Sequence, residues 1–360
     1  MQKAEDEKMD FIKNGGSLIN RLIAQKISEN CNEIRLSGNY EIEETILLPS
    51  DVTLILDNCY LKMADNTFCQ MFRNMSAEKK DVYDSNIHII GVGESVLDGG
   101  EYNGLSEKNS GRDGRPYIIV NNILTFSKVK KLSVSGLKII NMRWWALNFI
   151  ACSEGLIQDI DFASDATVID RETGERLYGF AGRGYDEIYI KNSDGIDLRL
   201  GCHDFLIENI TGFTEDDTVA LTALKSRIES YYPFPADAEE GIGNVTVRNI
   251  RAAAQCGIVR LLNQGGTVLH DITVDGVYDT SQNDDRLGRG DRGVKIGDRH
   301  LYGEYYPTEE ETYNITVKNV GARAKVALSV CGEIKNLLIE NINGFDGCET
   351  VIEKLACSAD

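Results

Sequence analysis

The sequence predicts an all-β fold, a single right-handed parallel β-helix that spans residues 1–360 as one domain. Short β-branched runs recur along the chain, each carries Gly, Asn or Asp at a matching place, and the shortest intervals between these residues are 22 or 23. A repeat of about 20–30 residues built from short strands is typical of a solenoid. One coil cannot bury its apolar side alone, so we expect the coils to stack around a continuous core of inward Val, Ile and Leu.

The repeating turn residue sets the spacing of the coils. Its successive intervals are 23, 50, 40, 22, 48 and 22, so the long intervals hold two coils, or one coil and a loop. Asn and Asp tolerate the left-handed backbone of a tight turn, and an Asn side chain can bond to its neighbour in the next coil. A leucine-rich repeat would need an LxxLxLxxN frame, which is absent, and an antiparallel sandwich gives no reason for the spacing. The turn residues are Gly136, Asp159, Asn209, Asn249, Asp271, Asn319 and Asn341.

The elements follow in order from the amino terminus. Residues 1–35 are expected to form a helical cap, because apolar residues recur at helical spacing from Ser17 to Asn30, with Ser17 as the N-cap. Such a cap would cover the open edge of the first coil. Residues 36–360 are expected to form the coils. Polar stretches near 163–186, 225–243 and 281–307 interrupt the rhythm, and loops of this kind commonly wall a binding groove.

The composition limits the partners. A net charge of −19 argues against nucleic acid and anionic membranes, and against a long polyanionic substrate unless a local basic patch overrides it.

The first residues do not resemble a signal peptide, and no apolar run is long enough to span a membrane. Nine cysteines without CxxC pairs suggest reduced thiols and a cytoplasmic location. The four histidines show no metal spacing, so we expect no metal and no cofactor. The oligomeric state is left open.

Two segments concentrate carboxylates one coil apart. KNSDGIDL carries Asp194 and Asp197, and FTEDDTVAL carries Glu215, Asp216 and Asp217. Neighbouring coils lie about 4.8 Å apart, so these side chains can reach the separation that glycoside hydrolysis requires. Crowding of like charges raises the pKa of one carboxyl, which suits a general acid. Asp also serves freely in solenoid turns, and this simpler role is sufficient for Asp197.

These motifs resemble glycoside hydrolase family 28, the polygalacturonase-like pectin hydrolases within the pectate-lyase-like β-helix superfamily. NSDGID is similar to the family's NTDGID motif and TEDDTVAL to its GDDCIAI motif, and the likeness extends over roughly residues 40–341. The resemblance implies an inverting hydrolase of a pectic or related oligosaccharide. It also implies that Asp194, Asp216 and Asp217 are the catalytic carboxylates, one as the acid and the others as bases that activate water.

The sequence departs from the family at two later motifs. Cys256, in AQCGIVRL, stands where the family's GHG motif has histidine. In DRGVKIGD, Lys295 falls at the Arg of the family's RIK motif and Gly297 at its Lys. Arg292 is nearby as a substitute cation, and Arg260 is a further candidate. The predicted substrate-binding residues are Lys295, Arg292, Arg260, Cys256, Trp144 and His203.

Two other functions remain open from the sequence. A polysaccharide lyase or uronate epimerase on the same fold would need a base together with a cation that neutralises a uronate carboxylate. A non-catalytic carbohydrate-binding solenoid would use its aspartates only in turns. Long loops near a groove further suggest exo action on an oligosaccharide, with Tyr231, Tyr232 and Phe234 as possible platforms for a sugar ring.

Overall fold

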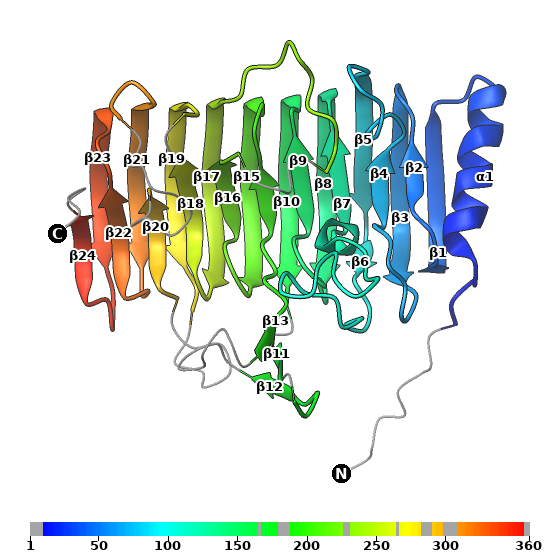
Figure 1. Ribbon diagram of the computed structural model, residues 1–360, viewed down its shortest axis with the longest axis horizontal. Helices are drawn as coiled ribbons and strands as arrows, with labels where there is room; N and C mark the ends of the chain where they lie inside the picture. Colours follow the sequence, from blue (N-terminus) through cyan, green and yellow to red (C-terminus); the bar gives the residue numbers. More distant parts are fainter. Residues whose placement is uncertain are drawn as a thin grey trace.

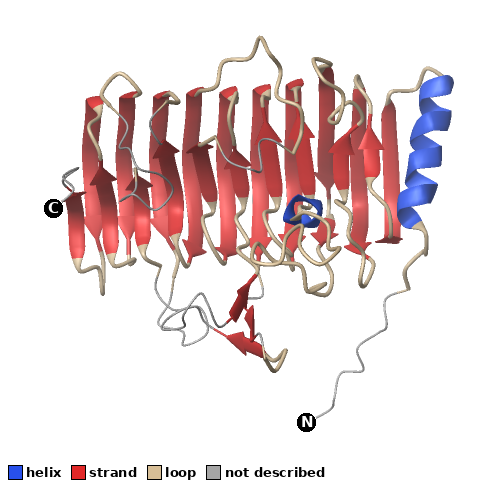
Figure 2. Cartoon of the chain, in the orientation of Figure 1, coloured by secondary structure: helices blue, strands red, loops and turns tan. Residues whose placement is uncertain are grey.

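The computed structural model describes residues 10–355 except 165–166, 171, 179–187, 226–230, 264–265, 282–289 and 298–307. It shows a stack of coils, each with a strand in two long parallel sheets that run the length of the molecule (Figures 1 and 2). This architecture confirms the predicted parallel β-helix. Parallel strands joined by crossovers give the right-handed sense of the coil.

The first sheet holds the longer strands. Its order is β1-β3-β5-β8-β10-β15-β17-β19-β21-β23, with the short β6 paired to β3 and β8. The bounds are β1 Glu33–Ile42, β3 Val52–Met63, β5 Asp84–Val92, β6 Val96–Asp98, β8 Val129–Ile140, β10 Ser153–Ala163, β15 His203–Thr214, β17 Ile242–Ala254, β19 Leu269–Asp279, β21 Thr312–Ala322 and β23 Lys335–Gly344.

The second sheet holds shorter strands, and its outer face carries the candidate site. Its order is β2-β4-β7-β9-β14-β16-β18-β20-β22-β24. The bounds are β2 Ile46–Leu48, β4 Phe72–Asn74, β7 Leu124–Ser127, β9 Leu147–Ile150, β14 Ile196–Leu198, β16 Val219–Ala223, β18 Gly257–Asn263, β20 Arg292–Ile296, β22 Val326–Cys331 and β24 Thr350–Leu355.

The predicted N-terminal cap is a helix, α1 (Gly15–Ser28), that packs on the first coil with Ile19 and Ile23 buried. It begins before Ser17, so the predicted N-cap is wrong. Asn14 is the N-cap, in a left-handed conformation and without a side-chain bond to the helix. Instead, the Glu43 carboxylate of the first coil accepts the backbone N–H groups of Gly16 and Ser17 at 3.1 and 3.0 Å. A carboxylate at this position also complements the positive end of the helix dipole.

A single apolar core runs along the axis of the solenoid. Inward side chains from both sheets pack against those of the next coil, as in the row of Phe126, Phe149 and Phe205, whose ring centroids are 6.1 and 5.7 Å apart. Cys152 and Cys202 are also fully buried within this core. Among the described cysteines none forms a disulfide. No helix in the described ranges is long and apolar enough to cross a membrane.

Two ladders of left-handed residues bend the strands of the first sheet. The first ladder contains the predicted turn residues other than Asp271. Their side chains form hydrogen bonds between coils; Asn249 Nδ2, for example, donates to Asn209 Oδ1 at 2.7 Å. The long intervals are single coils with a loop, because β10 pairs directly with β15 and β15 with β17. The prediction that Asp271 belongs to this ladder is wrong. Gly276, with φ 84°, occupies the position between Asn249 and Asn319. Asp271 belongs to a second ladder five residues earlier, Lys131, Glu154, Asp204, Asn244, Asp271, Asn314 and Asn336.

Loops depart from the coils near the predicted interruptions. In the first, β11 (Thr167–Asp170), β12 (Arg176–Tyr178) and β13 (Ile188–Ile190) form a small antiparallel sheet outside the solenoid (Figure 2). Much of the 281–307 interruption lies outside the described residues. A loop that the sequence did not single out, residues 99–123, contains the short 3-10 helix η1 (Ile118–Asn121) and also covers the second sheet.

The left-handed ladder makes a testable prediction at Asn249, whose φ is 52°. Asn249→Ala should lower the free energy of unfolding by about 1–2 kcal/mol, because Ala strains in this conformation and cannot bond to Asn209. Asn249→Gly loses the same bond but tolerates the backbone, so it should cost less than Asn249→Ala. Thermal and urea unfolding measure both variants. Equal losses would contradict the role given to backbone conformation.

Candidate active site

The outward side chains of the second sheet form one row across the coils. Ile196 and Leu198 of β14 point into the core, so Asp197 between them points outward. Strand register then places the outward residues of successive strands next to one another. In order from β9 to β22 they are Asn148, Asp197, Ala220, Arg260, Lys295 and Ser329.

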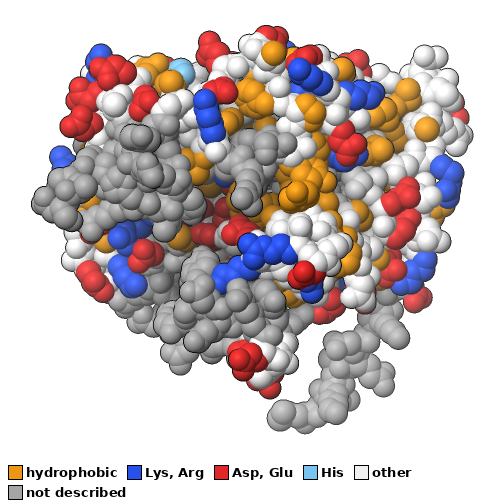
Figure 3. Space-filling model, in the orientation of Figure 1, with side chains coloured by type: hydrophobic (Ala, Val, Ile, Leu, Met, Phe, Trp, Pro, Cys, Tyr) orange, Lys and Arg blue, Asp and Glu red, His pale blue; other side chains and the backbone are white. Residues whose placement is uncertain are grey.

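A cavity of about 320 Å³ lies over the second sheet, and Arg260 is the member of this row that lines it. Figure 3 shows acidic side chains in the middle of this face, with apolar surface extending from them toward the α1 end. The wall combines outward residues of the second sheet with residues of the 99–123 loop and Tyr231. The lining residues are Glu107, Ser110, Arg112, Tyr117, Ile118, Ile119, Trp144, Trp145, Asn192, Asp194, Arg199, Asp216, Thr222, Leu224, Tyr231, Arg260 and Leu262.

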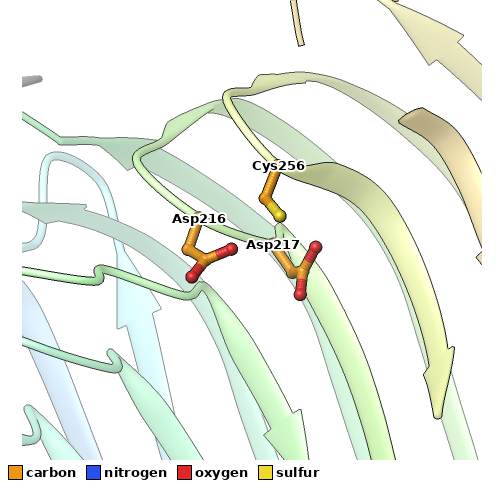
Figure 4. A group of neighbouring side chains, drawn as sticks. All are labelled: Asp216, Asp217 and Cys256. Atoms are coloured by element: carbon orange, nitrogen blue, oxygen red, sulfur yellow. The ribbon is translucent and has the colours of Figure 1, made fainter. Parts of the chain in front are cut away.

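The three predicted carboxylates meet at this cavity. Asp194 and Asp216 line it, and Asp217 is fully buried directly behind. The backbone N–H of Asp217 donates to Asp194 Oδ1 at 3.1 Å, which ties the two coils together at the cluster. Figure 4 shows Asp216 and Asp217 with Cys256, and one side-chain O or S atom of each lies within 4.8 Å of the other two. The predicted assembly of Asp194, Asp216 and Asp217 is therefore present.

Burial raises the pKa of every carboxyl in the cluster, and repulsion from neighbouring aspartates adds to the rise for Asp194 and Asp216. Burial, with the nearby Asp217 charge, raises the pKa of Asp216 to about 7. Burial and the neighbouring aspartates raise the pKa of Asp194 well above its usual range. Burial also raises the pKa of Asp217, but Arg260 and Lys295 oppose this rise. The cluster therefore shares protons near neutral pH, with the negative charge most favoured on Asp217.

Arg260 and Lys295 supply positive charge beside the cluster. Arg260 Nη1 lies 3.2 Å from Asp217 Oδ2, and Lys295 of β20 is paired in register with Arg260. Gly297, the expected position of the family's second cation, ends the same strand with φ 72°. A Cβ there would lie 1.9 Å from the Cys331 carbonyl oxygen, so the backbone leaves no room for a side chain. One of the two cationic positions is thus lost.

The remaining carboxylates of the two motifs have other environments. Glu215 points away from the cavity, where its carboxylate lies 3.5 Å from Lys191 Nζ and accepts a bond from Ser193 Oγ at 2.9 Å. Asp197 is buried beside Asp194 and Arg199. Burial and the neighbouring charges of Asp217 and Asp216 raise the pKa of Asp197 well above its usual range, although Arg199 opposes the rise. Because burial of an ionised carboxylate is costly, this environment favours the protonated form of Asp197.

The predicted binding residues divide into two groups. Arg260, Cys256, Lys295 and Trp144 lie at the cavity or beside the cluster. Cys256 donates to Asp216, and the Asp216 charge with burial raises the pKa of the thiol well above its usual range. Trp144 is fully buried: its ring stacks on Trp145 at 4.0 Å and its N–H donates to Glu107 at 3.0 Å. No face of Trp144 is open to a sugar.

Two predicted binding residues lie away from the cavity. Arg292 is not among its lining residues, because its guanidinium is held at the corner of the coil by Asp291 at 2.9 Å and Glu353 at 3.3 Å. His203 begins β15 in the first sheet and lines a separate hollow, with its Nδ1 2.7 Å from Asp204 Oδ2. The sequence placed both near the motifs but could not show which side of the coil each would occupy.

Several lining residues were not predicted from the sequence. Arg199 lies two residues after Asp197, on the same side of the chain, with its guanidinium 4.8 Å from the Trp145 ring centroid. Inward and outward residues alternate in NSDGIDLRL, and continuing this alternation two residues beyond Asp197 would have identified Arg199 as outward. Glu107, Arg112 and Tyr117 come from the 99–123 loop, which carries no repeat signal. The cavity therefore contains Arg112, Arg199 and Arg260, a local concentration of positive charge in an acidic protein.

Solved structures with a similar fold include several carbohydrate hydrolases. An exopolygalacturonase from Thermotoga maritima is 16% identical with a TM-score of 0.58, covering 96% of this chain and 88% of that one. The endo-xylogalacturonan hydrolase from Aspergillus tubingensis is 14% identical with a TM-score of 0.54, covering 94% and 92%. The polygalacturonase from Erwinia carotovora is 13% identical with a TM-score of 0.51, covering 99% of both. At these identities the likeness establishes the fold alone.

The family comes from the sequence itself. No protein of curated function matches the chain. The model of glycosyl hydrolases family 28 matches residues 38–232, more than half of the chain, and the matched segment includes all three clustered aspartates. Membership in this family favours hydrolysis over the lyase, epimerase and binding-solenoid alternatives. The chain belongs to glycosyl hydrolases family 28 and is a glycoside hydrolase.

Proposed function

We propose that this hydrolase removes the terminal sugar from an acidic, pectic oligosaccharide. The observation that carries the proposal is a single cavity in which Asp194 and Asp216 face Arg199 and Arg260. The carboxylates suit cleavage of a glycosidic bond. Arginine binds carboxylates well because its planar guanidinium can form two parallel hydrogen bonds. The arginines thus provide the basic patch that an acidic sugar requires in a protein of net charge −19.

Asp216 is the proposed general acid. Its pKa of about 7 leaves it largely protonated below neutral pH, and it lines the cavity where the leaving oxygen of the glycosidic bond would lie. Its proton passes to that oxygen as the bond to the anomeric carbon breaks. Because a general acid works best when its pKa is near the working pH, this carboxyl is well matched to the role.

Asp217 is the proposed base. Arg260 and Lys295 favour its ionised form, and the bond from its backbone N–H to Asp194 holds the two carboxyls in adjacent coils. A water between Asp194 and Asp217 would give its proton to Asp217 as its oxygen attacks the anomeric carbon. Direct attack by water gives a product of inverted configuration, as the family resemblance implies.

The size and walls of the cavity support the proposed exo action. Its volume of about 320 Å³ is near the lower end of the range for small-molecule sites, which suits one terminal sugar better than a continuous chain. Tyr117 and Tyr231 are 58% and 39% exposed and line the cavity, so they are the proposed platforms for a sugar ring, whereas Tyr232 is buried. A short oligosaccharide would also fit the cytoplasmic location expected from the cysteines, which stays a prediction.

The catalytic assignment predicts the behaviour of Asp217→Asn. On galacturonide oligomers, wild type should release only the terminal monosaccharide with the mass of one added water, and early ¹H NMR spectra should show the inverted anomer. Asp217→Asn should lose about 10²–10⁴-fold in kcat, because the amide cannot accept the proton of water. Asp346→Asn, at an exposed aspartate of the last coil, is the matched control. Oligomers of random length would refute exo action, and an active Asp217→Asn would refute the proposed base.

The contact between Cys256 and Asp216 predicts a shift in the pH profile. Rate should fall at high pH as Asp216 loses its proton, with an apparent pKa near 7. The Cys256 thiol stabilises the ionised form of Asp216 by donating a hydrogen bond, so it lowers this pKa. In Cys256→Ala, the fall in kcat at high pH should therefore occur at a higher pH.

Cys256→Ser is the matched variant for this experiment, because its hydroxyl can still donate to Asp216. Its high-pH limb should stay closer to that of wild type than the limb of Cys256→Ala. If kcat of Cys256→Ala falls at a lower pH than that of wild type, or at the same pH, another group controls the fall.

A further inference from the structure

One wall of the cavity is carried by a segment that crosses back over earlier coils. This segment, residues 231–241, which we call the strap, leads into β17, and it contacts residues of much earlier coils. Tyr83 OH donates to Asp237 Oδ1 at 3.0 Å, and Tyr232 OH donates to Gln70 Oε1 at 3.1 Å. Figure 1 shows the strap passing along the upper edge of the solenoid from near β8 to the start of β17.

Lys128 fastens the strap from inside the protein. It occupies the corner between β7 and β8 with φ 61° and is fully buried. Its Nζ donates to the carbonyl of Pro233 in the strap at 3.1 Å, to the carbonyl of Ala77 at 2.7 Å and to Ser127 Oγ at 3.0 Å. All three acceptors are neutral, and burial lowers the pKa of the ammonium. The charges of Asp84 and Asp81 favour the ammonium, but no carboxylate of the described residues forms an ion pair with it, so its three hydrogen bonds have to offset the cost of burial.

The strap places aromatic side chains at the cavity. Tyr232 is buried in a second apolar cluster with Trp144, Trp145 and Ile119, all of which line the cavity. Its neighbour Tyr231 has its ring 5.1 Å from Tyr232 and 5.7 Å from Tyr117. Tyr231 is the only part of the described strap among the lining residues. The position of Tyr231 therefore depends on the anchoring of Tyr232 and Pro233.

We propose that Lys128 is a positioning residue that sets the sugar-binding wall of the cavity through the strap and Tyr231. Lys128 does not line the cavity, so it acts on the substrate only through the strap. The bond to Pro233 is two residues from Tyr231, close enough that its loss lets the ring move. This inference rests on the proposed function for its effect on catalysis, whereas its effect on the structure of the cavity is independent of that function.

The kinetic test is a double-mutant cycle between Lys128 and Tyr231, measured on a galacturonide oligomer. Lys128→Met keeps the side-chain length but removes the donors, and should raise KM about tenfold with kcat within about twofold. Tyr231→Ala should also raise KM. If Lys128 acts through Tyr231, the double variant should resemble Tyr231→Ala alone. Lys128→Arg retains donors and should recover part of the loss.

Fluorescence provides a test that needs no substrate. The chain contains only 2 tryptophans, and Trp144 and Trp145 both lie in the cluster under the strap. Lys128→Met should make their fluorescence more accessible to quenching by acrylamide, by about twofold or more, because a displaced strap opens this cluster. Asn341→Ala is the matched control, because it removes an equivalent ladder bond in β23, a strand to which the strap is not joined, and it should leave quenching unchanged.

The outcomes separate the two claims. If wild type cleaves no glycan, the proposed function fails, and the quenching experiment still decides the role of Lys128. Independent, multiplicative KM effects of Lys128→Met and Tyr231→Ala, or unchanged quenching in a folded Lys128→Met, would overturn the inference. Should Lys128→Met not fold, Tyr232→Phe removes the hydroxyl that holds the strap to Gln70 and Arg73, and must raise both KM and quenching for the inference to stand.

Discussion

Parallel pairing between successive coils determines where every functional side chain of this protein lies. The spacing of about 4.8 Å between paired strands is set by backbone hydrogen bonds, so it does not depend on the side chains that the strands carry. Asp194 and Asp217 are brought together because β14 and β16 pair in register, and Arg260 follows because β18 is the next strand. A change of register by one residue would turn Asp197 and Arg260 into the apolar core.

The cluster holds more carboxyls than cations, and this surplus shapes its chemistry. Asp194, Asp197, Asp216 and Asp217 lie in one buried region, while Arg260 and Lys295 are the cations that act directly on Asp217. Four ionised carboxylates could not be accommodated there, because burial and repulsion both oppose their charges. The protein resolves this by keeping protons on part of the cluster. A proton donor and a proton acceptor can therefore occupy the same small space near neutral pH.

The sequence was most informative where the repeat operates. The turn ladder predicted the parallel solenoid, and the one-coil spacing predicted that Asp194 and Asp216 would lie together. The same reasoning misplaced Asp271, since two ladders five residues apart both carry Asn and Asp. It also did not show whether Arg292 and His203 face the cavity, because a side chain near a corner of the coil can point toward it or away from it. Glu107, Tyr117 and the strap could not be predicted, since loop contacts such as Tyr232 with Gln70 join residues far apart in sequence and follow no period.

The two turn ladders share one more property. Their residues remain five positions apart in every coil from Lys131 and Gly136 to Asn336 and Asn341, although the coils themselves differ greatly in length. All extra residues are therefore added outside this five-residue span, in the part of each coil that passes through the second sheet. A lineage of such proteins could lengthen, shorten or replace its cavity walls while the opposite side of the solenoid stays constant. Substrate preference could then diverge by loop exchange without a new fold having to be found.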